Sequence, residues 1–286
     1  MTLAPGPFDL TTLAAAKAAA RLTTAGDDDL IQRFVTTLSR TFINKCNRQS
    51  FYGRTVTTAL TATKVGYLIL PEYPVTSVSA LSSAGSSIPA AVAPTPGAPQ
   101  QPSGYLLTPS WDGVPPGSAQ QITAYGYGFG GGPGGVPITY RAGYEVIGEA
   151  ATVPASGAYT VAPAAVYGAA MVDSGVTLAG VAMVKVASAP AAGQYSFTQD
   201  VATGLWGYTF NAAQAGAAVL ISYSFSPWDV FGAVAEWVAE RYKYRDRMSE
   251  TTRSINGQQT AGFKIDDMPD FVAMVANQYT AVGPLF

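Results

Sequence analysis

The chain has 286 residues, of which 48% are hydrophobic and only 12% charged, and its formal net charge is -2. An average soluble domain has about 25% charged residues, so Ser, Thr, Gly, Ala and Pro must cover much of this surface, which suits a subunit enclosed by neighbours. The acidic excess argues against a dedicated nucleic-acid binder, while the absence of histidine and the single cysteine exclude Ser-His-Asp and Cys-His catalysis and an intramolecular disulfide.

The first 50 residues predict two helices. Thr11 or Thr12 can cap a short alanine-rich helix that runs to about Arg21. A second helix begins at Asp27–Asp29, because carboxylates are favourable at the positive end of the helix dipole, and ends near Lys45–Arg48. Its apolar face is formed by residues at helical spacing, namely Leu30, Ile31, Phe34, Val35, Leu38 and Phe42.

Residues 61–144 read as β-rich hairpins with long loops. Short strands are expected at Thr55–Leu60, Val65–Leu70, Pro74–Val78 and Ile138–Tyr140, and loops at 82–103 and 125–136. The second loop contains Gly126-x-Gly128-x-x-Gly131, which has the letters of a dinucleotide fingerprint. The fingerprint needs a helix directly after it, and Gly132, Pro133 and Gly134 forbid one, so we interpret the segment as a loop.

Residues 145–226 predict a separate antiparallel β module that resembles a sandwich. Gly, Pro, Ala and Asp interrupt its short apolar segments every 8–12 residues or so. The expected strands are Tyr159–Val161, Val176–Leu178, Val181–Val186, Gln194–Phe197, Gly207–Phe210 and Ala218–Phe225.

The last 60 residues return to helix. Ser226 can cap and Pro227 can start a helix whose apolar face includes Val230, Trp237 and Val238. Residues 250–264 read as a polar loop, and a last helix starts at Met268-Pro269. The predicted fold is therefore α+β: a helical core from both chain ends (1–60 and 227–286), the hairpins of 61–144 and the inserted module of 145–226.

Three isolated features of the sequence do not by themselves indicate a function. Asp27–Asp29 are better explained as the start of a helix than as a cation site, because consecutive helical positions do not converge. Cys46 is interpreted as a buried apolar residue, and the alternating charges of 240–247 as a solvated face. No signal sequence or membrane span is expected, and we predict a soluble protein made in a cytoplasm.

Several segments resemble, in their order, those of the head-tail connector proteins of tailed phages. They are Leu10–Leu13, Asp27–Ile31, Cys46–Phe51, Leu68–Leu70, Pro74–Val78, Ile138–Tyr144, Pro227–Val230 and Val238–Arg247. In that family a strand like TYRAGY leads straight to the helix of Pro-x-Asp-Val, whereas residues 145–226 intervene here. This interval resembles a β module of various phage virion proteins, with markers at 153–155, 173–177, 189–196, 207–210 and 219–223.

The resemblance implies a non-enzymatic head-to-tail adaptor in the virion neck, assembled in the host cytoplasm. Such an adaptor forms a ring, here a dodecamer, beneath the portal protein, docks the tail or a stopper protein, and lets the genome DNA pass without specific binding. Its C-terminal segment reaches the portal, and no cofactor, metal or membrane is involved. The candidate portal contacts are Arg253, Gln258, Phe263, Met268, Phe271, Tyr279 and Phe286; the candidate inter-subunit or channel residues are Arg241, Lys243, Arg245 and Arg247.

Two alternatives remain open at this point. Another virion protein, such as a tail or capsid-decoration component, would have the β module but no use for the helical ends. A virion glycosidase would need paired carboxylates, and the module offers only scattered acids, namely Glu145, Glu149, Asp173 and Asp200.

Overall fold

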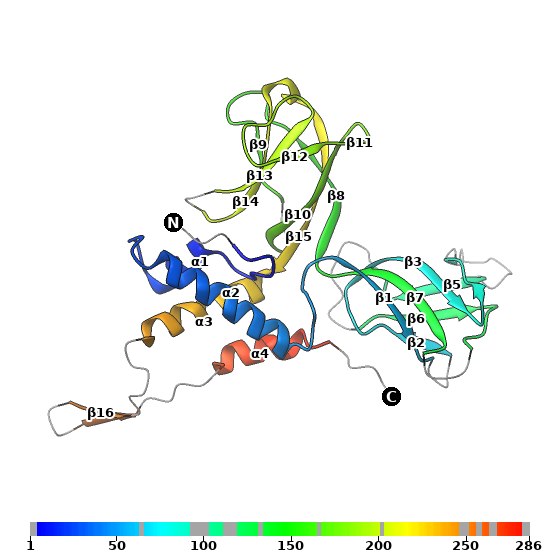
Figure 1. The fold of residues 1–286 in the computed structure, drawn as a ribbon, viewed down its shortest axis with the longest axis horizontal. Helices are drawn as coiled ribbons and strands as arrows, with labels where there is room; N and C mark the ends of the chain where they lie inside the picture. Colours follow the sequence, from blue (N-terminus) through cyan, green and yellow to red (C-terminus); the bar gives the residue numbers. More distant parts are fainter. Residues whose placement is uncertain are drawn as a thin grey trace.

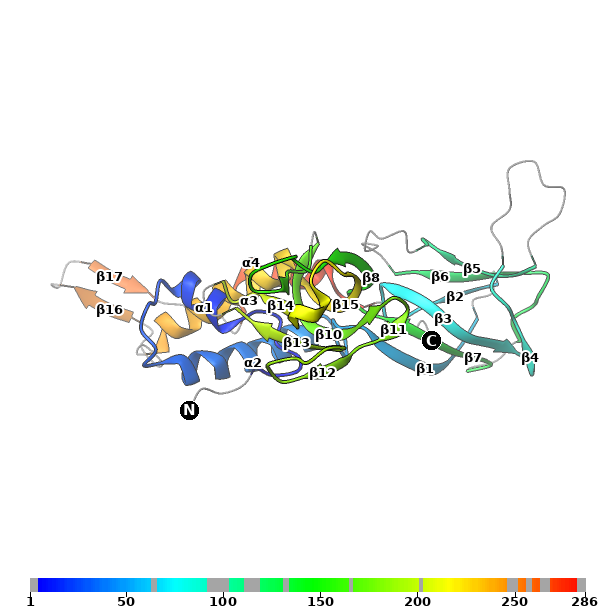
Figure 2. The same ribbon diagram turned by 90° about the horizontal axis from the view of Figure 1, so that it is seen from above.

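The computed structural model describes residues 5–62, 66–91, 103–110, 119–130, 134–164, 167–200, 203–245, 252–255, 259–262 and 268–281. The fold is α+β. A group of helices stands beside two β units, one built from strands β1–β7 and the other from β8–β15 (Figure 1). Seen from above, the molecule is elongated, with the β16–β17 hairpin at one end and the β1–β7 unit at the other (Figure 2).

Four helices from the two ends of the chain pack together. They are α1 (Leu13–Ala20), α2 (Asp28–Lys45), α3 (Trp228–Lys243) and α4 (Asp270–Gln278), and α3 contacts the other three. Thr12 caps α1, since its hydroxyl accepts the amide N–H of Ala15 at 3.2 Å. The proposed cap at Ser226 is wrong: strand β15 continues to Pro227, which is the N-cap of α3 and leaves Ser226 buried.

Residues 54–142 form a unit of two facing sheets, where the sequence predicted hairpins and long loops. One sheet has the order β1-β7-β3-β4 (Arg54–Leu60, Val136–Ala142, Val75–Ser83, Ser86–Ser87). The other has the order β2-β6-β5 (Tyr67–Ile69, Gln121–Tyr125, Gly104–Thr108). The glycine loop after β6 leads to the next described element, β7, which is a strand and not the helix that a dinucleotide site requires.

The module after Glu145 also has two sheets. The first has the order β11-β10-β15-β8 (Val181–Ala182, Gly168–Leu178, Ala218–Pro227, Glu145–Thr152). The second has the order β12-β13-β14-β9 (Val184–Val186, Gln194–Gln199, Trp206–Phe210, Thr160–Val161). The expected strand at Val181–Val186 is divided in two, and its second half pairs with β13 in parallel, a departure from the antiparallel prediction.

The hydrophobic core does not follow the predicted domain boundary at residue 145. One cluster of buried side chains runs without interruption from the helices, through Phe42 and Val234, into the module, through Phe225 and Tyr208. The β1–β7 unit has a separate cluster that includes Leu70 and Tyr140. The module and the helices are therefore joined by a common core, because β15 passes directly into α3.

The segment between α3 and α4 contains a hairpin, so the predicted polar loop at 250–264 is corrected. β16 (Thr252–Ile255) and β17 (Gln259–Gly262) pair antiparallel, with Thr252 opposite Gly262. The hairpin points away from the helices in both ribbon views (Figures 1 and 2). None of the helices in the described ranges is long and apolar enough to cross a membrane.

Candidate functional site

A buried arginine joins three parts of the chain. Arg48 follows α2 and is 4% exposed. Its Nε donates to the carbonyl of Tyr279 at the end of α4, and its Nη1 donates to the carbonyl of Tyr73 before β3. The guanidinium lies 4.1 Å from the ring centroid of Tyr73, 5.3 Å from that of Phe51 and 5.7 Å from that of Tyr144. Stacking of this kind stabilises a buried cation.

The strand-turn segment Ile138–Tyr144 forms the other half of this joint. Gly143 has φ +132, and a β-carbon there would lie 2.4 Å from the backbone carbon of Tyr52, so only glycine fits. The backbone N–H of Gly143 donates to Pro74, and that of Tyr144 donates to Phe51 at 2.7 Å. The turn is thereby hydrogen-bonded both to the segment that follows α2, at Phe51, and to the segment that precedes β3, at Pro74.

An ion pair closes the joint on the side of the module. Arg141 on β7 holds the carboxylate of Glu145 on β8, with Nε 2.8 Å from each oxygen and Nη2 2.6 Å from Oε2. The Glu145 side chain is fully buried, and the hydroxyl of Thr76 donates to it at 2.6 Å.

The Tyr279 hydroxyl donates to both oxygens of Asp229 at the start of α3, at 2.7 and 2.8 Å. Four segments of the connector-like pattern thus meet here: 46–51, 74–78, 138–144 and 227–230.

The basic end of α3 is only partly free. Arg245 lies 3.7 Å from the carboxylate of Asp27 and 3.9 Å from the ring centroid of Tyr242. The Tyr242 hydroxyl donates to the same carboxylate. Asp27 precedes α2 but makes no capping bond with its side chain, which revises its expected role: its carboxylate joins α3. Lys243 is exposed and Arg241 is half-buried, while Arg247 lies outside the described residues.

Of the three predicted portal contacts whose side chains the structure describes, Phe271 alone lies on an open surface. Tyr279 belongs to the joint, where burial, followed by its bond to Asp229, raises its pKa and keeps the hydroxyl protonated. Met268 packs against the core, and Phe271 is 38% exposed. Met274, one helical turn further on and 67% exposed, was not predicted, although its i+3 spacing from Phe271 indicates a common face. The structure describes no side chain for Arg253, Gln258, Phe263 or Phe286.

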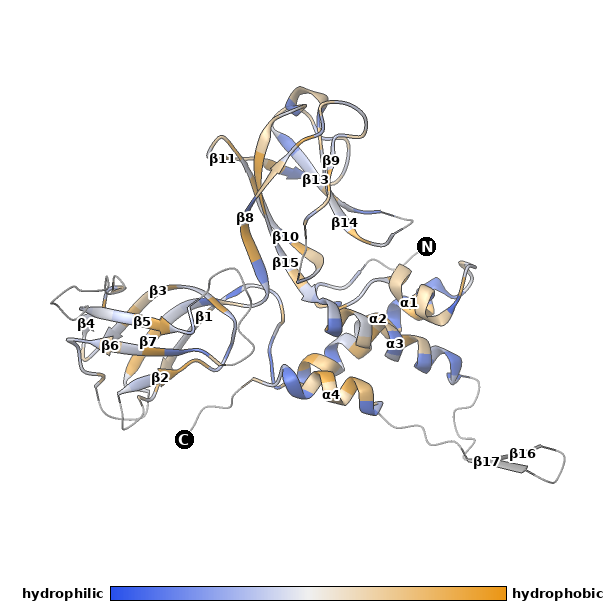
Figure 3. Ribbon diagram, turned by 180° about the vertical axis from the view of Figure 1, so that it is seen from behind, coloured by the Kyte–Doolittle hydropathy of each residue, from blue (hydrophilic) through white to orange (hydrophobic). Residues whose placement is uncertain are grey.

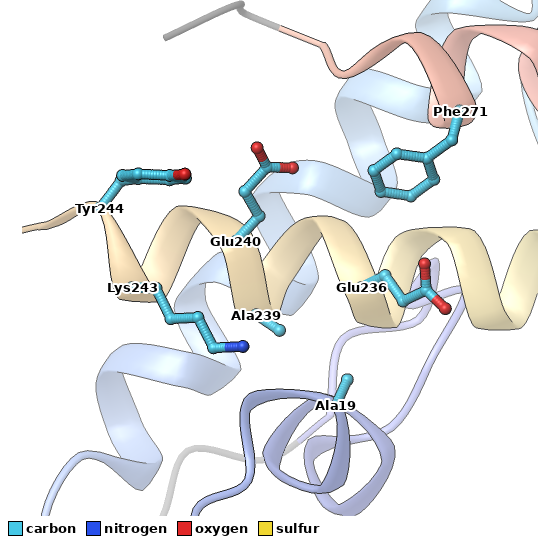
Figure 4. A pocket seen from close by; sticks show the side chains of 7 residues that line it. All are labelled: Ala19, Glu236, Ala239, Glu240, Lys243, Tyr244 and Phe271. Atoms are coloured by element: carbon cyan, nitrogen blue, oxygen red, sulfur yellow. The ribbon is translucent and has the colours of Figure 1, made fainter. Parts of the chain in front are cut away.

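A groove lies where α1, α3 and α4 meet (Figure 4). It has a volume of about 600 Å³ and is lined by Ala19 of α1, by Glu236, Ala239, Glu240, Lys243 and Tyr244 on or after α3, and by Phe271 of α4. Within the described ranges, the side-chain carboxylates of Glu236 and Glu240 have no ion-pair or hydrogen-bond partner. Figure 3 shows this charged end of α3 in blue beside the mostly apolar α4. The groove therefore combines apolar side chains with the carboxylates of Glu236 and Glu240 and the ammonium of Lys243.

Three of the four scattered acids that a glycosidase would need have separate structural roles. Glu145 pairs with Arg141, and Glu149 accepts the Tyr223 hydroxyl at 2.5 Å. Asp173 accepts the Tyr195 hydroxyl at 2.9 Å and pairs with Lys185 at 3.1 Å. No group of three or more His, Cys, Asp or Glu side chains among the described residues is arranged to hold a metal ion.

Cys46 is buried, as the sequence predicted. Its Sγ donates to the carbonyl of Ala276 on α4 at 3.4 Å, and burial raises its thiol pKa to about 12. A thiol with so high a pKa is a poor nucleophile at neutral pH. Cys46 therefore contributes to the packing of α4 on α2.

No family model matches the chain, and no curated protein sequence matches it. Among solved structures it is similar to "Neck of empty GTA particle computed with C6 symmetry", with 13% sequence identity and a TM-score of 0.37 over 100% of this chain and 96% of that chain. A TM-score this low carries no argument about function.

Proposed function

We propose that the chain is a structural protein of a virion neck: a head-to-tail adaptor that forms a ring beneath the portal, extends the DNA channel and docks the tail or a stopper protein. The observation that carries the proposal is the joint. Four of the eight segments through which the sequence resembles connector proteins, far apart along the chain, meet around Arg48 and Tyr144. A shared motif order would then reflect a shared way of fixing the helices to the β units.

The surface supports the same reading. Only 12% of the residues are charged, which suits a subunit with large contacts to its neighbours. The pairing of Arg245 with Asp27 removes one basic residue from the set that could bind phosphates. Each neutralised phosphate adds salt-dependent affinity, which a ring would multiply. A channel through which DNA slides requires a wall that does not bind DNA tightly.

The portal contact is proposed to lie on the outer face of α4, at Phe271 and Met274. Truncation at residue 248 is a poor test, because it removes α4 and exposes the core around Val272 and Ala276. The double variant F271S/M274S changes only exposed side chains and should keep the fold. The control is N277S, an exposed change on the same helix.

The experiment is assembly of the purified chain with the portal protein of its own phage, followed by electron microscopy and sedimentation. We expect a ring of adaptor on the wild-type portal, an unchanged ring with N277S, and at least tenfold weaker binding with F271S/M274S. Absence of any complex between the wild-type chain and the portal would refute the proposed function. Undiminished binding by the double variant would refute only this placement of the contact.

A further inference from the structure

We propose that the open edge of strand β1 (Arg54–Leu60) binds an extended segment of a partner protein, which adds to the sheet as a further strand. This contact does not depend on the ring of the proposed function. It follows from the position of β1 in its sheet, from the groove along its edge and from the side chains that border this groove.

β1 is a terminal strand whose outer edge has no partner strand among the described residues. The sheet has the order β1-β7-β3-β4, and β1 pairs with β7 from Arg54 to Leu60 without a shift of register. The outward N–H and C=O groups of an edge strand are unpaired and can pair with another chain. β1 therefore offers a regular row of donors and acceptors about 20 Å long.

The other edges of the described sheets are protected in the ways that natural proteins use. β3, β8 and β10 are long, but register shifts interrupt their pairing with neighbouring strands. β5 is covered, since Tyr105 donates to the carbonyl of Pro89 and accepts the N–H of Ala91. The remaining edge strands are short, with two to four residues each.

β1 has none of these protections. It contains no proline, no lysine and no bulge, and its one charged residue, Arg54, pairs with Glu72 at 3.2 Å. A groove of about 650 Å³ is bordered by five consecutive residues of the strand, Arg54–Thr58. Successive side chains point to opposite faces of a sheet, so consecutive residues border one groove only along the edge of the strand. The groove thus follows the free backbone groups of β1, which suits strand addition.

The far wall of the groove leaves room for one strand and not for a second sheet. It is formed mainly by residues at and after the end of α2, namely Asn44, Asn47, Arg48 and Gln49. The side-chain amides of Asn44, Asn47 and Gln49 are exposed and have no hydrogen-bond partner in the described structure. A single extended segment can lie between this wall and β1, whereas the edge of a second sheet would bring its next strand into the wall.

The two faces of β1 define the side chains that the segment needs. Val56 and Leu60 pack in the core of the β1–β7 unit, whereas Thr55, Thr57 and Ala59 are exposed. A strand beside β1 extends both rows, so it needs apolar residues on the first face and polar or small residues on the second. Because the half-exposed guanidinium of the first strand residue already has its carboxylate partner, the segment is expected to be uncharged where it contacts the groove.

The occupant is a partner protein because the described free segments of this chain are used within their own subunit. The two longest described segments outside helices and strands are residues 5–12 and 46–53. Both are packed into the core, since Leu10 and Phe51 are fully buried. A second copy of the chain is therefore the alternative that the experiment must separate.

The probe is a fluorescein-labelled peptide, VTITYTA followed by two lysines for solubility. It copies β7 (Val136–Ala142) with threonine in place of Pro137 and Arg141, and β7 already pairs with β1, so the alternation fits. Its affinity for the full chain is measured by fluorescence anisotropy, and hydrogen exchange locates the contact. The control probe is the same peptide N-methylated at every residue, which keeps the side chains but removes the N–H donors.

Two variants of the full chain complete the test. T58K places an ammonium at a half-buried position of the open edge, where a charge opposes strand addition. T198K is the matched control, because it makes the same change at an exposed position of β13, which has neighbours on both sides. The N-methylated control and the exchange measurement use the wild-type chain, so they decide the question even if T58K fails to fold.

We expect a dissociation constant below about a millimolar for wild type and T198K, and at least tenfold weaker binding for T58K. Bound probe should slow hydrogen exchange in Arg54–Leu60 and not in β8. The proposal would be overturned by absence of binding at a millimolar, by equal binding of the N-methylated peptide, by equal affinity of T58K, or by protection away from β1.

Two further results would overturn the assignment to a partner protein. Self-association of the wild-type chain that T58K abolishes would show that a second copy occupies the edge. Binding of the probe only after deletion of residues 282–286, which follow groove residue Ala281, would show that the chain covers its own edge. None of these measurements uses the portal, so loss of the proposed function would leave the strand-addition site standing.

Discussion

Replacement of Arg48 by alanine tests the joint that holds the helices to the β units. The substitution removes the guanidinium bonds to the carbonyls of Tyr73 and Tyr279, and bonds from a charged group contribute about 1.5–3 kcal/mol each. It also removes the stacking on Tyr73, worth about 1 kcal/mol. Nη2 of Arg48 is buried without a partner in the described structure, and its loss returns about 1–3 kcal/mol. The free energy of unfolding should therefore fall by about 1–6 kcal/mol, with a central value of about 3–4 kcal/mol.

The assay is urea unfolding followed by tryptophan fluorescence, combined with hydrogen exchange of the native protein. Because Arg48 binds the carbonyl of Tyr279, amides in α4 should exchange faster in R48A than in wild type, while amides in β10 and β15 should not. R33A is the control, since Arg33 is exposed on α2, the helix that precedes Arg48, and it should change stability by less than about 0.5 kcal/mol. An R48A variant within about 1 kcal/mol of wild type, with unchanged exchange in α4, would refute the proposed role of the joint.

Three further predictions concern the same region. The Cys46 thiol should resist iodoacetamide at pH 8 in the native protein and react after unfolding. Because burial raises the pKa of this thiol from 9.0 to about 12 in the folded protein, its contribution to the free energy of unfolding should decline as pH rises from about 9 toward 12. The C46A variant should lack this pH-dependent decline. E145Q should lower stability by about 1–3 kcal/mol in urea unfolding, because it leaves half-exposed Arg141 without its carboxylate; an unchanged midpoint would contradict this. G143A should cost more than about 3 kcal/mol or prevent folding, whereas G180A, where a β-carbon meets nothing within 4 Å, should cost about 1 kcal/mol; equal melting temperatures would show that the close approach at residue 143 is unimportant.

Sequence reasoning worked where one local pattern decides the structure. The apolar spacing and terminal charges of residues 27–48 predicted a helix, and α2 extends over Asp28–Lys45. It failed where pairing depends on a distant partner. β5 and β6 form a sheet with β2, although no strand was predicted at either position, and β10 starts in an alanine-rich stretch whose partner is β15.

The candidate site was harder to predict than the elements. Arg48 lies among polar residues in the sequence, and only the convergence of three distant tyrosines makes it a buried centre. Tyr279 was predicted to contact the portal, yet its partners Asp229 and Tyr144 come from other elements of the same chain. The groove at Glu236 and Glu240 has no signature in the sequence, since it depends on how three helices cross.

The first and last residues of the β1–β7 unit are neighbours in one sheet, and this has a consequence for engineering. Arg54, its first strand residue, is the ladder partner of Ala142, its last, so the chain enters and leaves the unit at adjacent positions about 5 Å apart. With a core of its own, the unit could be expressed as a separate domain whose two ends are adjacent. Its excision from the chain would instead remove Tyr73, Thr76 and Arg141, and would leave buried Arg48 and Glu145 without those partners.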